Sequence, residues 1–164
     1  MFQTCLNLED VNLPLTCTGI NDNAFDGDSK LTTINLSHVT YIGSSVFQNC
    51  FLLEYCNGPN STQGELNLPN LTGTLGNYAF KGCTKLTSIT SLGSITSIGN
   101  NAFENCSGLT SITINAVTPP TLGSNAFDNT NNCPIYVPAS SVAAYQSASG
   151  WSNYSARIQA IPTT

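Results

Sequence analysis

A phenylalanine that returns at nearly constant spacing is the feature that most constrains how this chain folds. It stands at Phe2, Phe25, Phe47, Phe80, Phe103 and Phe127, at spacings of 23, 22, 33, 23 and 24 residues. A branched aliphatic residue precedes most copies by five positions, and an apolar residue or Cys follows by six. Self-similarity at a period of about 23 residues indicates a solenoid, in which each unit buries its apolar face against the next. We therefore predict a repeat solenoid over residues 1–138 with about six coils, the first of them partial.

The turn around each phenylalanine has its own pattern. Gly or Asn, the residue types that tolerate a left-handed backbone, stands two positions after each later Phe, at Gly27, Asn49, Gly82, Asn105 and Asn129. In the unit 98–114, Asn100 or Asn101 is expected to cap a short helical turn through its side-chain oxygen. Each coil is thus predicted to contain one short turn that ends just after its phenylalanine.

A short strand is predicted after each turn. In the same unit, inward Ile112 and Ile114 alternate with outward Ser111 and Thr113. Stacked coils would join these strands into a parallel sheet, each coil adding about 4.8 Å. A second short strand is expected at 96–98, on the way into the next turn.

Residues 139–164 do not repeat, and we predict that they form a C-terminal capping segment. Ser140 or Ser141 is expected to begin a short helix, and Gly150 to end it. In the coil before this segment, Ile135 and Val137 are the expected inward pair, which turns Tyr136 outward. The apolar residues that would cover the last coil are Val142, Tyr145, Trp151, Tyr154, Ile158 and Ile161.

One coil departs from the period. The spacing of 33 between Phe47 and Phe80 carries about ten extra residues, placed within 54–65. The polar stretch from Asn57 to Gly64 is expected to protrude, because it has no apolar side chain to pack inward. Leu66 and Leu68 resume the strand pattern, but Cys56 fits the same strand position, and both registers stay open.

The motif Leu-x-x-Ile-x-Ile, followed by Ile-Gly-x-x-Ala-Phe-x-x-Cys and clearest in 86–114, resembles the BspA-type leucine-rich repeat. The resemblance covers nearly the whole chain. It implies a right-handed leucine-rich-repeat-like coil with a parallel β-sheet, short helical turns and a C-terminal cap. Proteins of this type are found on surfaces of gut and oral bacteria and of mucosal protists, and in phages of such bacteria. The resemblance therefore implies adhesion or recognition rather than catalysis.

Charge is scarce in this chain. Charged residues make up 8% of the sequence and the net charge is −5, with only four bases, Lys30, Lys81, Lys85 and Arg157. Four scattered cations cannot neutralise a run of phosphates, so nucleic-acid binding is disfavoured. No apolar run approaches a membrane span, and no secretory signal is expected after Met1.

The residues that could carry chemistry favour structural roles. Four of the seven cysteines (Cys5, Cys50, Cys83 and Cys106) lie three positions after a Phe, where we expect buried, reduced thiols. There is no C-x-x-C pair, and His38 is the only histidine, expected as a plain surface residue, so a zinc site is disfavoured. Asp22, Asp26 and Asp28 do not match a calcium loop. No catalytic residue, metal or cofactor is predicted.

Two surfaces remain as candidates for function. The first is a neutral polar sheet face with two aromatic residues, which suits contact with a glycan or a protein. The same hydroxyls also suit a soluble strand surface with no ligand. This candidate ligand surface comprises Thr33, Asn35, Tyr55, Ser88, Thr90, Ser111, Thr113 and Tyr136. The second is an assembly edge at the partial first coil, Leu8, Val11 and Leu13, where the first strand would leave its ladder unpaired and favour self-association.

We hypothesise a non-enzymatic binding or adhesion module at a bacterial cell or virion surface, recognising a protein or glycan. The alternative is a structural assembly subunit, such as a phage virion decoration or fibre component. Both place the chain outside the cell, on a cell surface or on a virion, without insertion into a membrane.

Overall fold

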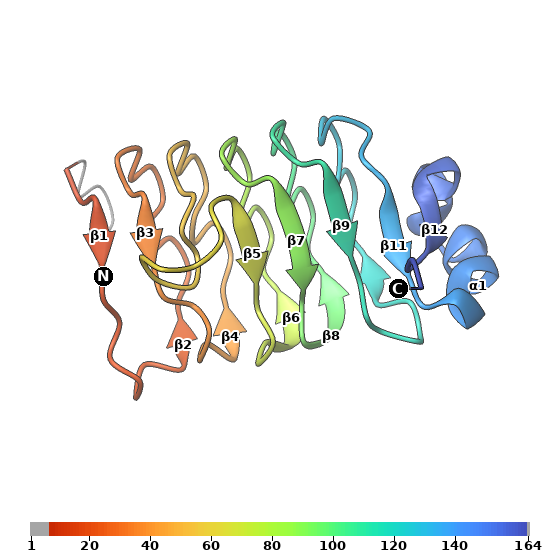
Figure 1. The fold of residues 1–164 in the computed structure, drawn as a ribbon, viewed down its shortest axis with the longest axis horizontal. Helices are drawn as coiled ribbons and strands as arrows, with labels where there is room; N and C mark the ends of the chain where they lie inside the picture. The colour runs from red at the N-terminus through yellow and green to blue at the C-terminus, as the bar shows by residue number, and fades with distance from the viewer. Residues whose placement is uncertain (1–6, 164) are drawn as a thin grey trace.

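The computed structural model of the chain, which describes residues 7–163, is a solenoid whose parallel strands line two faces (Figure 1). The strands of one face form a two-stranded and a five-stranded ladder, which we together call the front sheet, and the five strands of the other face form the back sheet. The front sheet contains β1 (Asp10–Val11), β3 (Thr33–Ile34), β5 (Glu65–Asn67), β7 (Ser88–Ser91), β9 (Ser111–Thr113), β11 (Ile135–Val137) and β12 (Ile158–Ala160). The back sheet contains β2 (Gly19–Ile20), β4 (Tyr41–Ile42), β6 (Thr72–Leu75), β8 (Ser94–Ile98) and β10 (Thr121–Leu122). The predicted solenoid fold is confirmed.

A column of stacked phenylalanine rings runs through the core. Phe80 and Phe103 lie 5.5 Å apart between ring centroids with an interplanar angle of 3°, and Phe103 and Phe127 repeat that geometry. The rings from Phe25 onward are at most 1% exposed. Inward residues of both sheets, such as Ile112 and Ile98, complete one continuous core. The period of the sequence is therefore the spacing of this column, except that Phe2 lies outside the described residues.

The turns around these rings are left-handed at the predicted places. The backbone φ angle is positive at all five residues that stand two positions after Phe: Gly27, Asn49, Gly82, Asn105 and Asn129. The turns are not helical, however, and the predicted cap is wrong. The Asn100 side-chain oxygen accepts from the backbone N–H of Ser124, at 2.8 Å, in the next coil. Asn77 does the same for the N–H of Asn100, so these side chains join coils instead of capping turns.

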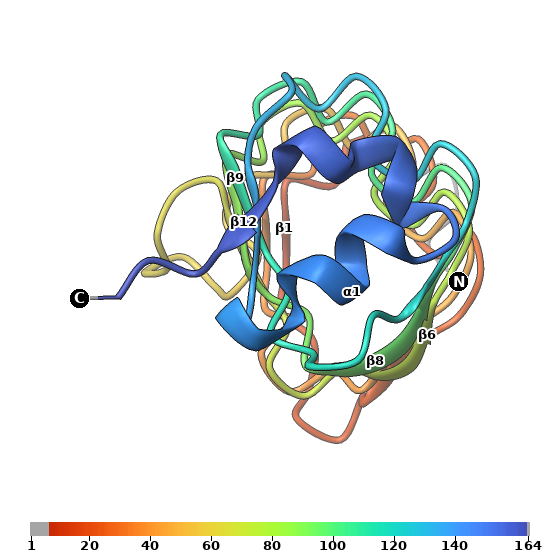
Figure 2. The ribbon, with the colours of Figure 1, turned by 90° about the vertical axis from the view of Figure 1, so that its right-hand side faces the viewer.

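The C-terminal segment covers the end of the solenoid, as Figure 2 shows. A 3₁₀ turn (Ala139–Ser141), α1 (Val142–Ser147) and a second 3₁₀ segment (Trp151–Arg157) lie across the last coil. Trp151 is fully buried, and its indole N–H donates to the Pro120 carbonyl at 2.7 Å. Ile135 and Val137 point inward as predicted. The sequence pattern did not predict β12, which adds a last strand beside β11.

Arg157 fastens this segment to the solenoid. Its guanidinium donates to the carbonyl oxygens of Cys133 (2.8 Å) and Phe127 (3.2 Å) and to the Thr130 hydroxyl (2.9 Å). These acceptors lie in the turn of the last coil, where Thr130 takes the position that cysteine holds in other coils. Arg157, one of the four bases of the sequence, is therefore a structural residue.

Candidate functional site

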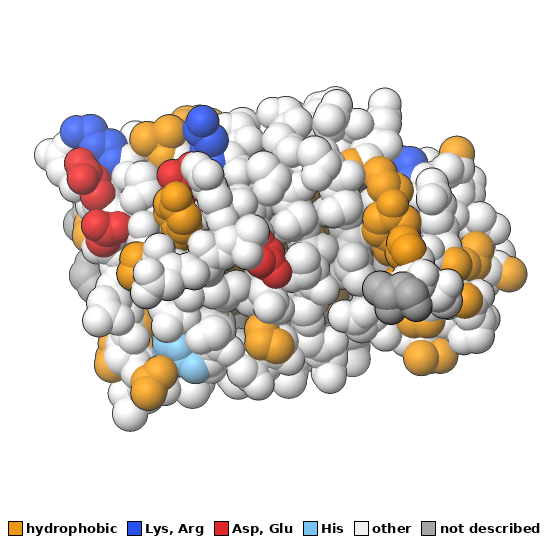
Figure 3. Space-filling view, viewed as in Figure 1, with side chains coloured by type: hydrophobic (Ala, Val, Ile, Leu, Met, Phe, Trp, Pro, Cys, Tyr) orange, Lys and Arg blue, Asp and Glu red, His pale blue; other side chains and the backbone are white. Residues whose placement is uncertain are grey.

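All eight residues of the candidate ligand surface lie on the outer side of the front sheet or beside it. Strand register places Ser88 opposite Ser111 and Thr113 opposite Tyr136, while Tyr55 bridges to Thr33. Each of the eight is half-buried, as expected for outward side chains packed along a ladder. Figure 3 shows this face as a mostly uncharged surface with scattered apolar groups. The two-residue period of the strands thus brings the predicted residues together.

Hydroxyl groups on the two sheets differ in how they are bonded. Among the described residues, the hydroxyls of Tyr55, Ser88, Ser111, Thr113 and Tyr136 make no hydrogen bond with another protein group. On the back sheet and its approach, threonine hydroxyls instead donate to backbone carbonyls of the preceding coil, at 3.1 Å to 3.3 Å. Those threonines are Thr40, Thr72, Thr96 and Thr121. The front face therefore offers free hydroxyls at Tyr55 and from β7 to β11, interrupted at β5, where the outward residues are Glu65 and Asn67.

The charged side chains at the outward strand positions of the front face are all acidic. The outward strand positions within residues 7–163 carry two carboxylates, Asp10 and Glu65, and no Lys or Arg. Glu65 accepts a hydrogen bond from the Thr90 hydroxyl at 2.7 Å. Because the chain has a net charge of −5, this face is disposed toward neutral or cationic groups and repels anionic ones.

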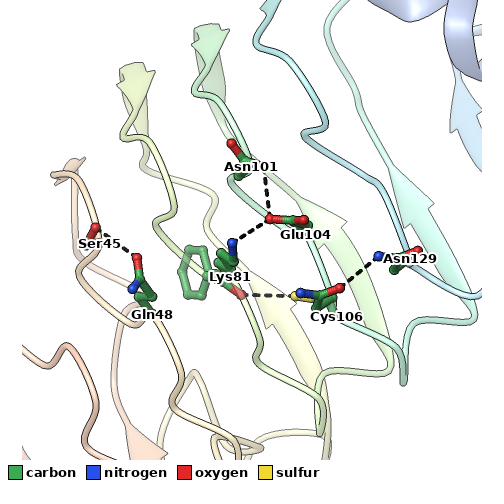
Figure 4. A network of polar contacts seen from close by, with 9 residues as sticks. Ser45, Gln48, Lys81, Asn101, Glu104, Cys106 and Asn129 are labelled. Atoms are coloured by element: carbon green, nitrogen blue, oxygen red, sulfur yellow. Dashed lines mark hydrogen bonds and ion pairs between the residues drawn. The ribbon is translucent and has the colours of Figure 1, made fainter.

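A second polar surface lies along the phenylalanine turns, shown in Figure 4. Lys81 and Glu104 form an ion pair at 2.7 Å, and the Asn101 amide donates to the same carboxylate at 2.9 Å. The hydrogen bond from Lys81 lowers the pKa of Glu104, and burial opposes that shift. Asn129 similarly donates to Asn105 in the preceding coil. These groups are already paired with each other, which makes this surface a weaker candidate for ligand contact than the front face.

The sequence left two strand registers open at the insertion, one with Cys56 inward and one with Leu66 inward, and the structure contains both. The backbone carbonyl of Thr32 accepts from Tyr55, and the carbonyl of Glu54 accepts from Gly64, which in turn accepts from Thr87. Cys56 and Leu66 are therefore both inward residues, and both are fully buried. Leu66 lies in β5, whereas Cys56 lies in an added segment held by isolated bridges at Tyr55 and Asn57. In the back sheet, β4 and β6 pair directly.

Only part of the insertion protrudes, which corrects the expectation for the stretch 57–64. Pro59, Asn60, Thr62 and Gln63 are exposed, whereas Gly58 and Gly64 are buried. The exposed loop projects from the front face, seen edge-on in Figure 2 as the yellow loop. It stands next to Thr33 and Asn35 and forms the wall of a cleft with them.

The assembly edge is the part of the core with the least cover among the described residues. Leu8, Val11 and Leu13 are half-buried, whereas inward residues of later coils are nearly all buried. β1 pairs with β3 on one side, through Asp10 and Val11. A hollow of about 230 Å³ lies nearby, lined by Leu13, Ile20 and Ala24 among others.

The thiols predicted to lie in the core are there. Cys50, Cys83 and Cys106 are free and fully buried, and each donates its S–H to the carbonyl of the phenylalanine one coil earlier, at 3.0 Å to 3.2 Å. Cys5 lies outside the described residues. Burial raises the pKa of Cys50 and of Cys106 to about 12. These thiols are inert core groups and not nucleophiles.

We expect alkylation to separate the thiols by burial. Native protein treated with iodoacetamide at pH 8 should be labelled at Cys17, which is half-buried, and not at Cys50, Cys83 or Cys106. Denatured but unreduced protein should be labelled at all of them, as read by peptide mass spectrometry. A Cys83–Cys106 bridge would contradict this assignment.

Burial of the Cys106 thiol should also make the stability of the fold depend on pH. Because the folded pKa of Cys106 is raised from an ordinary value near 9 to about 12, the contribution of the thiol to the free energy of unfolding is intact below pH 9 and should fall as pH rises toward 12.

The remaining candidates for chemistry do not form a site. Within residues 7–163, no group of three or more His, Cys, Asp or Glu side chains is placed to hold a metal ion. His38 is half-buried and not the plain surface residue expected, and neither ring nitrogen hydrogen-bonds a described residue. The same part of the chain contains no helix with the length and apolar character to cross a bilayer.

Comparison with known families agrees with this architecture. Residues 1–64 and 60–149 match the model of the BspA type leucine rich repeat region, in 6 copies. The chain belongs to the BspA-type leucine-rich-repeat family. Such repeats are typical of extracellular or surface-associated proteins, often with a role in adhesion, and their fold is typically non-enzymatic.

Among solved structures, the BspA-type chain is similar to a leucine-rich repeat protein from Bacteroides ovatus ATCC 8483. The sequence identity is 21% and the TM-score is 0.35, over 82% of this chain and 56% of that one. This chain thus spans little more than half the length of that protein. A search of curated proteins found no match.

The BspA-type frame gives a sharp prediction for the insertion. Deleting residues 56–65 joins Tyr55 to Leu66 and restores the family pattern as Leu53-x-x-Leu66-x-Leu68. The back sheet and the phenylalanine column already stack directly across this point, with Phe47 and Phe80 at 5.1 Å. We therefore expect the shortened chain to melt cooperatively, within roughly 5 °C of the parent, in a circular dichroism experiment. A chain that fails to fold would show that the added strand is structurally required.

Proposed function

We propose that this chain is a non-enzymatic binding module at a bacterial cell or virion surface, which recognises a protein or a glycan through its front face. The observation that carries the proposal is the set of free hydroxyls on that face, at Tyr55 and from Ser88 to Tyr136, on strands that carry no Lys or Arg among the described residues. Hydroxyl and tyrosine groups supply hydrogen bonds and contact area without the cost of removing charges from water. The membership in a family often linked to surface adhesion supports the same assignment.

Binding should therefore depend on the front face and not on the back. The test places purified protein on panels of immobilised glycans and extracellular proteins, and compares two double variants. S111R/T113R changes two front positions, while T74R/S94R adds the same charge at exposed back-sheet positions. We expect the front variant to lose at least about tenfold in affinity for a bound panel member, which is about 1.4 kcal/mol, and the back variant to keep it. Equal binding by both variants, at equal melting temperatures, would contradict the proposal.

A structural assembly subunit, such as a virion decoration or fibre component, is the second candidate. It is favoured by the half-buried Leu8, Val11 and Leu13, since an edge strand with apolar neighbours is a template for a second copy of the chain. Light scattering should then show association that V11K weakens and that V117K, at an exposed valine far along the chain, does not. Strictly monomeric protein at high concentration would rule this candidate out.

A further inference from the structure

The protruding loop turns one end of the front face into a cleft. The cleft has a volume of about 350 Å³ and lies between the loop after Gly58 and the first two front strands. Its lining combines groups from three separate segments, Asp10, Val11, Asn12, Thr33, Asn35, Gly58 and Pro59. Two of these, Thr33 and Asn35, belong to the candidate ligand surface predicted from the sequence. Val11 belongs to the predicted assembly edge, and Asp10, Asn12, Gly58 and Pro59 were not named as candidate site residues.

The wall of the cleft is held in place by backbone hydrogen bonds. The Gly58 N–H donates to the Ile34 carbonyl at 3.1 Å, which fixes the start of the loop against β3. The Gly58 carbonyl accepts from both the N–H and the hydroxyl of Ser61, at 3.1 Å and 2.7 Å. Gly58 has a φ of +91°, a backbone conformation that other residues adopt only with strain. The cleft is therefore a preformed feature of the fold, which lowers the ordering cost of binding.

The chemistry of the lining suits a cation on an apolar stem. Among the described residues of the lining, Asp10 alone is charged; it is exposed, and its carboxylate accepts one long hydrogen bond, at 3.5 Å, from the Thr32 hydroxyl. Val11 and Pro59 supply apolar surface, along which the methylene groups of a long basic side chain can lie. The Asp10 carboxylate, together with the amide oxygen of Asn12, supplies acceptors for the N–H donors of a guanidinium or ammonium group.

We propose that this cleft receives an arginine or lysine side chain from an extended, basic segment of a protein partner. The inference rests on the proposed function and names the partner's chemistry at one end of the same face. A second carboxylate, Glu65, lies three ladder positions further along the front face, counted through Thr33 and Tyr55. Three strand spacings amount to about 14 Å. That distance is close to the reach of four residues of extended chain, so basic residues at positions i and i+4 would meet Asp10 and Glu65.

A short peptide tests this directly. The probe is fluorescein-labelled Gly-Arg-Gly-Ser-Gly-Arg-Gly, and the control peptide has glutamate in place of both arginines. At low salt we expect the arginine peptide to bind and to shift the NMR amide signals of Thr33, Asn35 and Gly58. The glutamate peptide should do neither. D10N should weaken binding by about fivefold, the size of one exposed charge pair.

A matched variant separates the cleft from general charge attraction. D22N removes the same charge from an exposed aspartate, and its amide oxygen can still accept the hydrogen bond from the Ser44 N–H. If D10N and D22N weaken binding equally, only net charge is involved and the inference is wrong. It is equally wrong if a neutral oligosaccharide shifts these amide signals and the arginine peptide does not.

The two proposals fail separately. If S111R/T113R abolishes binding on the panels while the peptide leaves Thr33, Asn35 and Gly58 unshifted, the front face functions without this cleft and the inference falls. If the peptide shifts these signals while S111R/T113R keeps all binding, the cleft stands and the broader assignment of the front face falls.

Discussion

Replacing Phe103 with alanine should lower the melting temperature by roughly 10 °C. The ring is fully buried and stacks at 5.5 Å on Phe80 on one side and on Phe127 on the other. Removing such a ring costs about 3–5 kcal/mol through lost burial and the cavity that remains. In a chain of this length, that loss corresponds to a shift of this size. Because each coil contacts only its neighbours, a cavity at Phe103 weakens two interfaces at once.

The chain contains its own control for this experiment. Among the phenylalanines of residues 7–163, Phe51 is the one outside the column, and it is 45% exposed. F51A makes the same chemical change at the surface, so it should alter the free energy of unfolding by no more than about 0.5 kcal/mol. Melting curves by circular dichroism compare the two variants. If F103A and F51A melt within a degree or two of each other, the stacked column is not what stabilises the fold.

The periodic parts of the structure could be predicted because sequence period and spatial period coincide. A phenylalanine that recurs once per coil stacks on the phenylalanine of the neighbouring coil, so the column from Phe25 to Phe127 follows from the spacing alone. The left-handed positions follow in the same way, since Gly and Asn recur where the turn ends. Alternation by two fixed which side chains of β9 and β11 face out. The candidate ligand surface was therefore found as a surface, although its role was not.

The insertion was beyond sequence reasoning for a physical reason. Cys56 and Leu66 both satisfy the strand pattern, and a sequence pattern alone assumes that one strand per coil is used. The chain instead places both inward on the front face, because the backbone groups of the added segment find partners on both sides: the Tyr55 carbonyl accepts from the Ile34 N–H, and the Glu54 carbonyl accepts from the Gly64 N–H. The back sheet has no such addition, since β4 pairs directly with β6.

Contacts between segments far apart in sequence were also missed. The Asn100 oxygen bonds the next coil and not its own turn, because the stacked backbone N–H of Ser124 lies within reach. Arg157 binds carbonyl oxygens more than twenty residues away, which no local pattern encodes. For the cleft, the one available signal was Gly58-Pro59, which ends a strand and starts a loop. That signal does not say which strands the loop will stand beside.

Replacing Gly76 with alanine is expected to destabilise the chain by about 3 kcal/mol, near the upper end for overpacking. A Cβ at this position would overlap the carbonyl group of Gly43 and the backbone nitrogen of Ser44, in the coil before it. These are backbone atoms, which cannot rotate away as a side chain can. The two coils would have to separate, which stretches the 3.1 Å bond from the Gly76 N–H to the Ile42 carbonyl and the Phe47–Phe80 stack. Urea unfolding monitored by circular dichroism would measure the loss.

Gly19 provides the matched substitution. It has no positive φ, and a Cβ there would meet only the Tyr41 side chain, at an ordinary 3.6 Å. Both G19A and G76A remove the same conformational freedom from the unfolded chain, so that contribution cancels when the two are compared. The difference between them then measures the clash between coils. G19A should be neutral or slightly stabilising, and if G76A were equally benign, the close approach of Gly43 and Gly76 would not be what sets the spacing of the coils.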